Sequence, residues 1–229
     1  GETIDYGPCA FMDAYDPNTV FSSIDHMGRY AYANQPMIAQ WNLARLAETL
    51  IPLMNSNIDD AIELAKDTIT SFTDIYQRKW EQMMRSKLGL FDQKPGDDQL
   101  IKELFDWMKT NHADYTNTFY ELSKGSKPTG KVFNDRVFSD WFESWQDRLS
   151  QNKDTKAASL TMMKEHNPVL IPRNHQVEAA LTAATDGDYT PFNELLSVLI
   201  GPYKDCESKK PYQSPPPPSE RVYQTFCGT

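Results

Sequence analysis

The sequence lacks several features that would place it in a common functional class. No uninterrupted apolar run approaches the roughly 20 residues that a membrane-spanning helix needs. Basic residues are outnumbered, and the formal net charge of −9 argues against a nucleic-acid-binding surface. The four histidines form no His-Glu-x-x-His or comparable cluster, so metal-dependent hydrolysis has little support. Ser22 and Ser23 lack the flanking glycines of a nucleophile elbow, which gives no indication of a serine hydrolase.

Cysteine is also scarce. Cys9, Cys206 and Cys227 are too few and too widely spaced for a disulfide framework or a Cys-x-x-Cys metal site. We interpret Cys9 and Cys206 as incidental thiols of a reduced protein. Cys227 differs from them because it lies at the end of a tail that we expect to be exposed.

The sequence does have the composition of an ordinary globular protein. Hydrophobic residues make up 39% and aromatic residues 12% of its 229 positions, enough to bury a substantial core in one large domain or two small ones. Apolar residues recur at helical spacing, and no alternating strand pattern of useful length occurs. The sequence therefore predicts an all-α body.

The expected helices follow one another from residue 34 to residue 201. Asn34 and Asn57 can cap the first two helices, and Gly89 supplies a stop for the second. The five tryptophans fall at helical spacings and are most simply core residues. The predicted helices cover residues 34–55, 57–88, 101–108, 115–122, 133–149, 157–165, 175–185 and 191–201.

Residues 6–33 contain glycines and prolines but no sustained period, which predicts a long ordered loop. Long loops within compact domains are usually functional. We interpret its acidic residues Asp13, Asp16 and Asp25 as serving turns and solvation. His26 in this loop allows two interpretations: it contacts a substrate, or it braces the loop through a hydrogen bond. We favour the second.

The composition changes to proline, serine and lysine from Pro202 onward. The four prolines from Pro215 to Pro218 favour an extended polyproline II tail laid along the body, with a ligand for a proline-recognising domain as the alternative. Arg173 and Asn174 precede a predicted helix whose N-terminus could bind an anion. We favour instead a cap made by Asn174 and a structural ion pair made by Arg173.

The first eight residues contain the strongest chemical signal. Asp5 follows a short apolar segment and precedes Tyr6-Gly7, where a glycine lets the backbone turn away and leaves the carboxylate exposed. An Asp-aromatic-Gly step of this kind holds Mg²⁺ in protein kinases. On spacing alone, a metal ligand and a turn cap are equally good interpretations of Asp5.

Further segments make this signal specific, because together they resemble the selenoprotein O (SelO) family. The resemblance covers essentially the whole chain. Its segments are Ile4-Asp5-Tyr6-Gly7-Pro8, Phe11 to Pro17, Gly28 to Tyr32, Asn34-Gln35-Pro36, Trp41-Asn42-Leu43, Ala113 to Phe119, Asn167-Pro168, Pro172-Arg173-Asn174 and Cys227-Gly228-Thr229.

The resemblance implies the helical C-terminal lobe of a protein-kinase-like (pseudokinase) fold. Residues 1–33 would be a metal-binding segment and activation-type loop, 34–201 the helical lobe, and 202–229 the extended tail. It implies a transferase that carries AMP from ATP to Ser, Thr or Tyr hydroxyls of proteins. Asp5 would bind ATP through Mg²⁺ or Mn²⁺, and Cys227 would be the redox residue. The protein would be cytoplasmic if bacterial, as its ending suggests, and mitochondrial if eukaryotic.

The resemblance also implies that other parts of the active site lie outside this chain. In the family, the glycine-rich segment, the nucleotide-binding lysine, the phosphate-binding arginines and the catalytic base all precede the position of Asp5. We therefore expect the catalytic base to lie upstream of Gly1, and we assign no catalytic residue within the chain. The expectation is a C-terminal portion that is inactive alone, the alternative being a non-catalytic helical scaffold or interaction module. Phe21 stands where some members carry a cysteine, which puts a disulfide between tail and loop in doubt.

Overall fold

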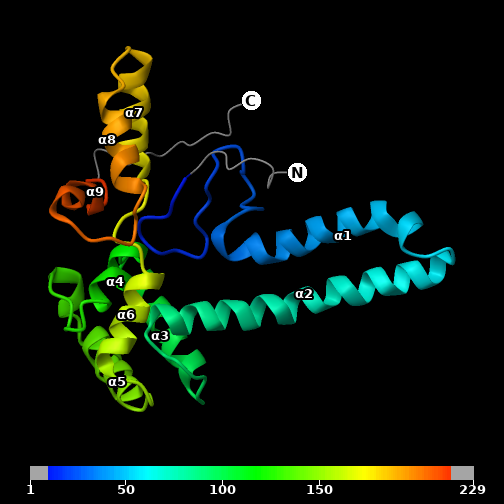
Figure 1. Cartoon of the computed structure of the whole chain (residues 1–229), viewed down its shortest axis with the longest axis horizontal. Coiled ribbons are helices and arrows are strands. Elements are labelled where there is room, and N and C mark those ends of the chain that lie inside the picture. Colours follow the sequence, from blue (N-terminus) through cyan, green and yellow to red (C-terminus); the bar gives the residue numbers. More distant parts are fainter. Residues whose placement is uncertain (1–9, 218–229) are drawn as a thin grey trace.

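The computed structural model describes residues 10–217, and most of them are helical (Figure 1). Within that range no β-strand occurs, only an isolated antiparallel bridge between Ala14 and Asp114. The all-α prediction is confirmed. The α-helices are α1 (Gln35–Met54), α2 (Ile58–Lys87), α3 (Asp97–Thr110), α4 (Tyr115–Leu122), α5 (Arg136–Ser150), α6 (Lys156–His166), α7 (Asn174–Thr185), α8 (Thr190–Leu199) and α9 (Lys210–Gln213), and the 3-10 helices include η2 (Tyr32–Asn34), η3 (Lys131–Asn134) and η4 (Glu207–Lys209).

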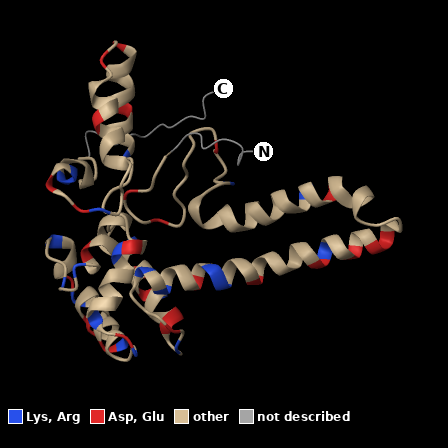
Figure 2. Cartoon of the chain, in the orientation of Figure 1, with Lys and Arg blue, Asp and Glu red and all other residues tan. Residues whose placement is uncertain are grey.

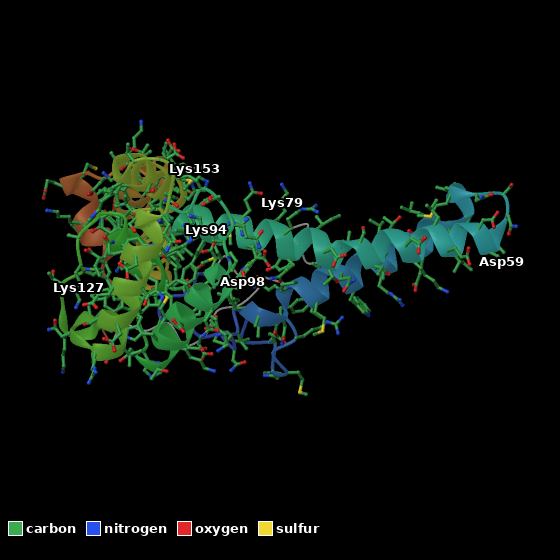
Figure 3. The ribbon with its side chains drawn as sticks, turned by 90° about the horizontal axis from the view of Figure 1, so that it is seen from below. Asp59, Lys79, Lys94, Asp98, Lys127 and Lys153 are labelled. Carbon is green, nitrogen blue, oxygen red and sulfur yellow. The ribbon has the colours of Figure 1, made fainter. Side chains whose placement is uncertain are left out.

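Helices α1 and α2 form an antiparallel hairpin that projects as an arm from the rest of the molecule (Figure 1). Figure 3 places Asp59 at the far end of α2 and Lys79 nearer the body. Asn57 caps α2 as predicted, because its Oδ1 accepts a hydrogen bond from the Asp59 amide at 3.0 Å. Acidic residues gather at this tip (Figure 2), where negative charge favours a helix N-terminus.

The start of α1 differs from that of α2. Asn34 immediately precedes α1, but its side chain makes no cap bond to that helix. Its Nδ2 donates instead to Gly28 O at 2.8 Å, within the preceding loop. The prediction that Asn34 caps the first helix is therefore wrong, and its side chain ties the loop to the base of the arm.

The arm leaves much of its apolar surface uncovered. Ile58 is 63% exposed, and Trp41 is 47% exposed with the Arg29 guanidinium 4.6 Å from its ring centroid. The prediction that Trp41 is a core residue is therefore wrong. Two helices that face only each other cannot bury the full width of both apolar stripes. Trp107, Trp141 and Trp145 are buried as predicted.

The main core lies where the end of α2 meets α3, α4, α5 and α6. Two tryptophans of α5 hold this junction, since each indole N–H donates to a backbone carbonyl of a neighbouring segment. Trp141 Nε1 donates to Leu100 O at 2.8 Å, and Trp145 Nε1 donates to Leu88 O at 2.9 Å. A buried indole needs such a partner, and the large ring adds apolar area to the core.

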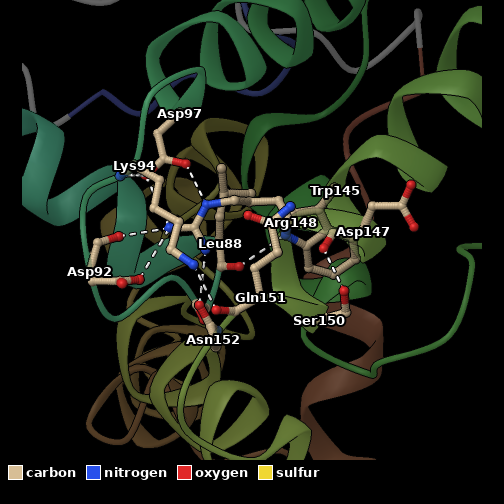
Figure 4. Close-up of polar contacts among 11 residues, drawn as sticks. Leu88, Asp92, Lys94, Asp97, Trp145, Asp147, Arg148, Ser150, Gln151 and Asn152 are labelled. Carbon is tan, nitrogen blue, oxygen red and sulfur yellow. Dashed lines mark hydrogen bonds and ion pairs between the residues drawn. The ribbon is translucent and has the colours of Figure 1, made fainter.

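A buried network of ion pairs and hydrogen bonds around Arg148 lies at the same junction (Figure 4). Arg148 on α5 donates through Nε to Asp97 Oδ1 at 2.6 Å and through Nη2 to the Asp92 carbonyl at 2.7 Å. Its Nη1 donates to Asn152 Oδ1 at 3.1 Å, and Asn152 in turn donates to Gly89 O at 2.9 Å. Every nitrogen of the guanidinium is thus hydrogen-bonded, which offsets the cost of burying it.

Helices α7 and α8 pack as a pair with a smaller core of their own, which stands apart from the main body in Figure 1. Its buried members are Leu170, Ala180, Leu195 and Val198. The segment after α8 was expected to be extended, but η4 and α9 form two short helical turns within it. Lys209 stabilises these turns, because its ammonium donates to the carbonyls of Gly201 and Lys204.

No helix in the described range combines the length and the apolar character that crossing a membrane requires.

Candidate functional site

The loop before α1 is held in shape by its own acidic side chains. The Asp25 carboxylate accepts hydrogen bonds from the amides of Arg29 and Tyr30, each at 2.8 Å. Asp16 Oδ1 accepts one from the Asn18 amide at 2.9 Å. These are the turn interactions predicted for Asp16 and Asp25, and they make this part of the loop an ordered structure.

Asp13 has a different role from the one predicted. Arg173 is fully buried, and its Nη1 donates to Asp13 Oδ1 at 2.5 Å and to Asp114 Oδ2 at 2.6 Å. Its Nη2 reaches Asp114 Oδ1 at 3.2 Å. The predicted ion pair of Arg173 is confirmed, whereas the interpretation of Asp13 as a turn or solvation residue is wrong. The carboxylate turns inward because a buried guanidinium needs anionic acceptors.

Asp114 also begins α4. Its Oδ1 accepts a hydrogen bond from the Asn117 amide at 2.7 Å, which makes it the N-cap of that helix. Burial raises the pKa of Asp114, and the hydrogen bond and charge of Arg173 oppose that rise. Two carboxyl groups thus face one guanidinium. Arg173 Nε finds no acceptor among the described residues.

Backbone hydrogen bonds join the loop to the helical body beside this ion pair. The Tyr15 amide donates to Ala113 O at 2.9 Å, and the Tyr115 amide donates to Asp13 O at 2.8 Å. The loop therefore runs alongside the start of α4 as a short antiparallel bridge. This pairing accounts for the bridge in an otherwise helical structure.

Asn174 adds a second attachment for the loop. Its Oδ1 accepts from the Phe11 amide at 3.0 Å, and its Nδ2 donates to the Phe11 carbonyl at 3.3 Å. The prediction that Asn174 caps a helix is wrong, because α7 begins at Asn174 itself and Arg173 is the N-cap residue, without a side-chain cap bond. The amide group is occupied instead by the backbone of the loop.

The tail also contacts Arg173. Arg173 Nη2 donates to Gln213 O at 2.8 Å, and Asn117 Nδ2 donates to the same carbonyl at 3.0 Å. Gln176 Nε2 reaches Pro211 O at 3.3 Å. We refer to Asp13, Asp114, Arg173 and the Gln213 carbonyl as the Arg173 cluster. It joins three parts of the chain: the loop, the start of α4 and the tail.

Two cavities flank this cluster. One has a volume of about 380 Å³ and is lined mainly by the loop, and the other has a volume of about 700 Å³ and lies toward α4 and the tail. Asp13, Ala14 and Asn174 line both of them. Of the cluster, Asp13 thus lines both cavities and Asp114 lines the second.

Histidines line both cavities. His112 lies in the second cavity and has a φ of 48°, the left-handed region that glycine usually occupies after a helix. His26 lines the first cavity and is exposed. The hydrogen bond by which His26 was expected to brace the loop is not found among residues 10–217.

Aromatic contacts fix the apolar side of the loop. The Tyr15 ring lies 4.7 Å from that of Phe105 and 6.0 Å from that of Tyr115, measured between centroids. Burial, together with the neighbouring Tyr32, raises the pKa of Tyr15 to about 12. The Tyr15 phenol therefore stays neutral at physiological pH and serves as a packing residue.

The two residues singled out from the sequence, Asp5 and Cys227, lie outside the described residues, as does Gly1. The expectation that the catalytic base lies upstream of Gly1 therefore stays a prediction, and so do the roles of Asp5 and Cys227. Cys206 lies within the described range and is a free, exposed thiol, as predicted.

The described residues do not complete a metal site by themselves. Residues 10–217 contain no group of three or more His, Cys, Asp or Glu side chains that could hold a metal ion. The loop acids Asp13, Asp16 and Asp25 are already engaged with Arg173 and with backbone amides.

Sequence reasoning identified Arg173 but missed its partners. Asp114 could have been found from its place before Tyr115, since aspartate is a preferred N-cap residue and a helix was expected to start there. Asp13 gave no such signal, because nothing local distinguishes it from the other acids of the loop.

Comparison with known proteins gives a consistent result. Residues 1–200 match the family model described as protein adenylyltransferase SelO. Along its full length the chain is 55% identical to a protein nucleotidyltransferase YdiU of Nitrosococcus oceani and 53% identical to those of Alcanivorax borkumensis and Alkaliphilus metalliredigens. It covers 46%, 48% and 47% of these three proteins, so it spans about half the length of the curated relatives it matches.

Proposed function

Because the chain belongs to the SelO family of protein adenylyltransferases, we propose that it is the C-terminal part of an enzyme that transfers AMP from ATP to protein hydroxyls. The acceptors would be Ser, Thr and Tyr side chains. The observation that carries the proposal is the family match, which runs from the first residue and so includes Asp5. The cytoplasmic location remains a prediction from the ending Cys227-Gly228-Thr229.

In the proposed reaction, the acceptor hydroxyl oxygen bonds to the α-phosphorus of ATP and the bond from that phosphorus to the bridging oxygen breaks. Pyrophosphate leaves, and the hydroxyl proton passes to the base expected upstream of Gly1. Asp5 would hold Mg²⁺ or Mn²⁺, which would neutralise charge on the pyrophosphate. This chain would otherwise contribute a fixed loop after Asp5, attached through Phe11 and Asp13 to the helical body.

The experiment that tests this proposal is a chimera in which the chain replaces the matching part of the Nitrosococcus oceani relative. The chimera is incubated with casein, Mg²⁺ and ATP that is radioactive at either the α- or the γ-phosphorus. AMP transfer labels casein only from α-labelled ATP, whereas phosphate transfer labels it only from γ-labelled ATP. Label from the γ position alone, or from neither, would overturn the proposal. Mass spectrometry of the labelled casein identifies the acceptor side chains.

The role of Asp5 has its own test in the same chimera. Asp5→Asn keeps the shape of the side chain and removes its charge, so we expect a loss of AMP transfer on the order of a hundredfold. Asp74→Asn is the matched control, since Asp74 is an exposed carboxylate in the middle of α2. Near-normal transfer by Asp5→Asn at ordinary Mg²⁺ concentration would show that Asp5 is not the metal ligand.

A second candidate function is a non-catalytic helical scaffold. It is favoured by one observation, the lack of a metal-binding group of side chains among the described residues. Isothermal titration of the chain with Mg-ATP, compared with the chimera, separates the two cases. A scaffold leaves both proteins without nucleotide binding, whereas the proposed enzyme binds nucleotide in the chimera.

A further inference from the structure

Two fully or largely buried arginines each bridge two carboxylates in this protein, but their surroundings differ. Arg148 joins elements of one core and uses all of its nitrogens. Arg173 joins the loop, the start of α4 and the tail, and its partner Asp13 lines both cavities. A buried ion pair is weak evidence for stability, because desolvation can offset the attraction between its charges. What distinguishes the two arginines is therefore the place of each ion pair in the fold.

The geometry around Arg173 bears on Asp5. Phe11 lies six residue steps after Asp5 in the sequence, and Asn174 hydrogen-bonds to both its amide and its carbonyl. An extended chain spans at most about 3.3–3.6 Å per residue, so six residue steps reach no farther than about 20 Å from this attachment. Asn174 holds Phe11 and Arg173 holds Asp13. Because these two residues are adjacent in sequence, both attachments of the loop are made at one place, the start of α7.

We propose that Arg173 is a positioning residue for nucleotide binding, an inference that rests on the proposed function. Through Asp13 it holds the loop that follows Asp5 against the body, and through the Gln213 carbonyl it ties that loop to the tail. Losing either attachment frees the loop and weakens the binding of Mg-ATP, while the helical cores remain intact. The tail thereby takes part in nucleotide binding without contacting the nucleotide.

Three variants test this role. Asp13→Ala removes the contact between the loop and the guanidinium but leaves the Arg173–Asp114 pair in place. Arg173→Lys keeps the positive charge beside Asp114 but lacks the planar fork that reaches all of its partners. Asp74→Ala is the matched control for the loss of an exposed carboxylate.

The first measurement uses the chain alone and needs no activity. Hydrogen exchange of the amides of Phe11 and Tyr15, which donate to Asn174 and Ala113, reports on attachment of the loop. We expect exchange there to be about tenfold faster in Asp13→Ala and Arg173→Lys, the size expected for losing a charged hydrogen bond, with α5 unchanged. Exchange equal to that of Asp74→Ala would overturn the proposal whether or not the protein transfers AMP.

The second measurement uses the chimera. We expect the KM for Mg-ATP to rise about tenfold in Asp13→Ala and in Arg173→Lys while kcat stays close to that of the control, because only binding depends on loop position. The double variant should be no worse than the poorer single one, since both changes break the same attachment. Additive effects, or a fall in kcat at unchanged KM, would overturn the proposal. A wild-type chimera without AMP transfer would instead refute the proposed function and leave the exchange result standing.

Discussion

Lys87 is the buried cation with the least electrostatic support in the described part of the chain. It lies in the last turn of α2, is 8% exposed, and places its ammonium 4.6 Å from the ring centroid of Phe119 and 5.6 Å from that of Tyr115. Its hydrogen bond goes to the carbonyl of His166 at 3.3 Å, and no salt bridge to Lys87 is found among residues 10–217. Burial lowers the pKa of Lys87 from 10.5 to about 8.

The magnitude follows from that pKa. Each factor of ten in proton affinity is worth about 1.4 kcal/mol, so the protonated folded state is penalised by about 3 kcal/mol at neutral pH. Lys87→Met fills the same space without a charge but loses the two cation–π contacts, worth about 1 kcal/mol or more, and the bond to His166. We therefore expect the variant to be more stable than the wild type by about 1–2 kcal/mol at pH 7.

The pH dependence gives the sharper result. Between pH 8 and 10.5 the folded protein has released the Lys87 proton and the unfolded chain still holds it, so wild-type stability rises with pH in this window. The advantage of Lys87→Met should therefore shrink by about 2 kcal/mol between pH 7 and pH 9.5. Tyrosine titration affects both proteins alike and cancels in the difference.

The assay is urea unfolding of both proteins at these two pH values, followed by circular dichroism. Lys79→Met serves as the control, because Lys79 is an exposed lysine of the same helix (Figure 3). A difference between Lys87→Met and wild type that stays constant from pH 7 to pH 9.5 would refute the reasoning. It would mean that Lys87 keeps an ordinary pKa despite its burial.

Three further predictions follow from the fold and the proposed function. Arg148→Met leaves Asp97 buried and unpaired, so we expect a loss of about 3 kcal/mol or more in urea unfolding; an unchanged midpoint would contradict this. Gly89→Ala puts a Cβ 3.0 Å from Met163 Sδ at a φ of 74°, and it should cost more than about 1 kcal/mol in the same assay. The chain alone should transfer no AMP to casein, and labelling at the level of the chimera would show that it carries a complete active site.

The helices were predictable from the sequence because their signals are local. Asn57 precedes a long apolar stripe and caps α2, and Gly89 adopts a φ of 74° just after that helix ends. The partner of a stripe is not a local property. The apolar stripes of α1 and α2 would suit buried helices as well as they suit the arm. The sequence therefore could not show that Trp41 on α1 and Ile58 on α2 would stay exposed.

The candidate site was less predictable because its bonds link distant residues. Asn174 looked like a cap, since asparagine before a helix usually is one, yet its amide binds Phe11 across 163 residues. Arg173 was expected to form an ion pair, but its acceptors lie 160 and 59 residues away. Short-range patterns identify which side chains need partners and leave the choice of partner to the tertiary fold.

The contrast between the two buried arginines indicates where that fold serves function. Arg148 satisfies its whole guanidinium within one core, whereas Asp13 and Asp114, the carboxylate partners of Arg173, line the described cavities. Arg173 keeps a buried Nε without an acceptor among the described residues, although replacing the ion pair by apolar groups would avoid that cost. An arrangement that is poorer for stability but joins the loop after Asp5 to the tail is best explained by what it positions. For this reason the Arg173 cluster, and not the better-bonded Arg148 network, is the place to look for effects on nucleotide binding.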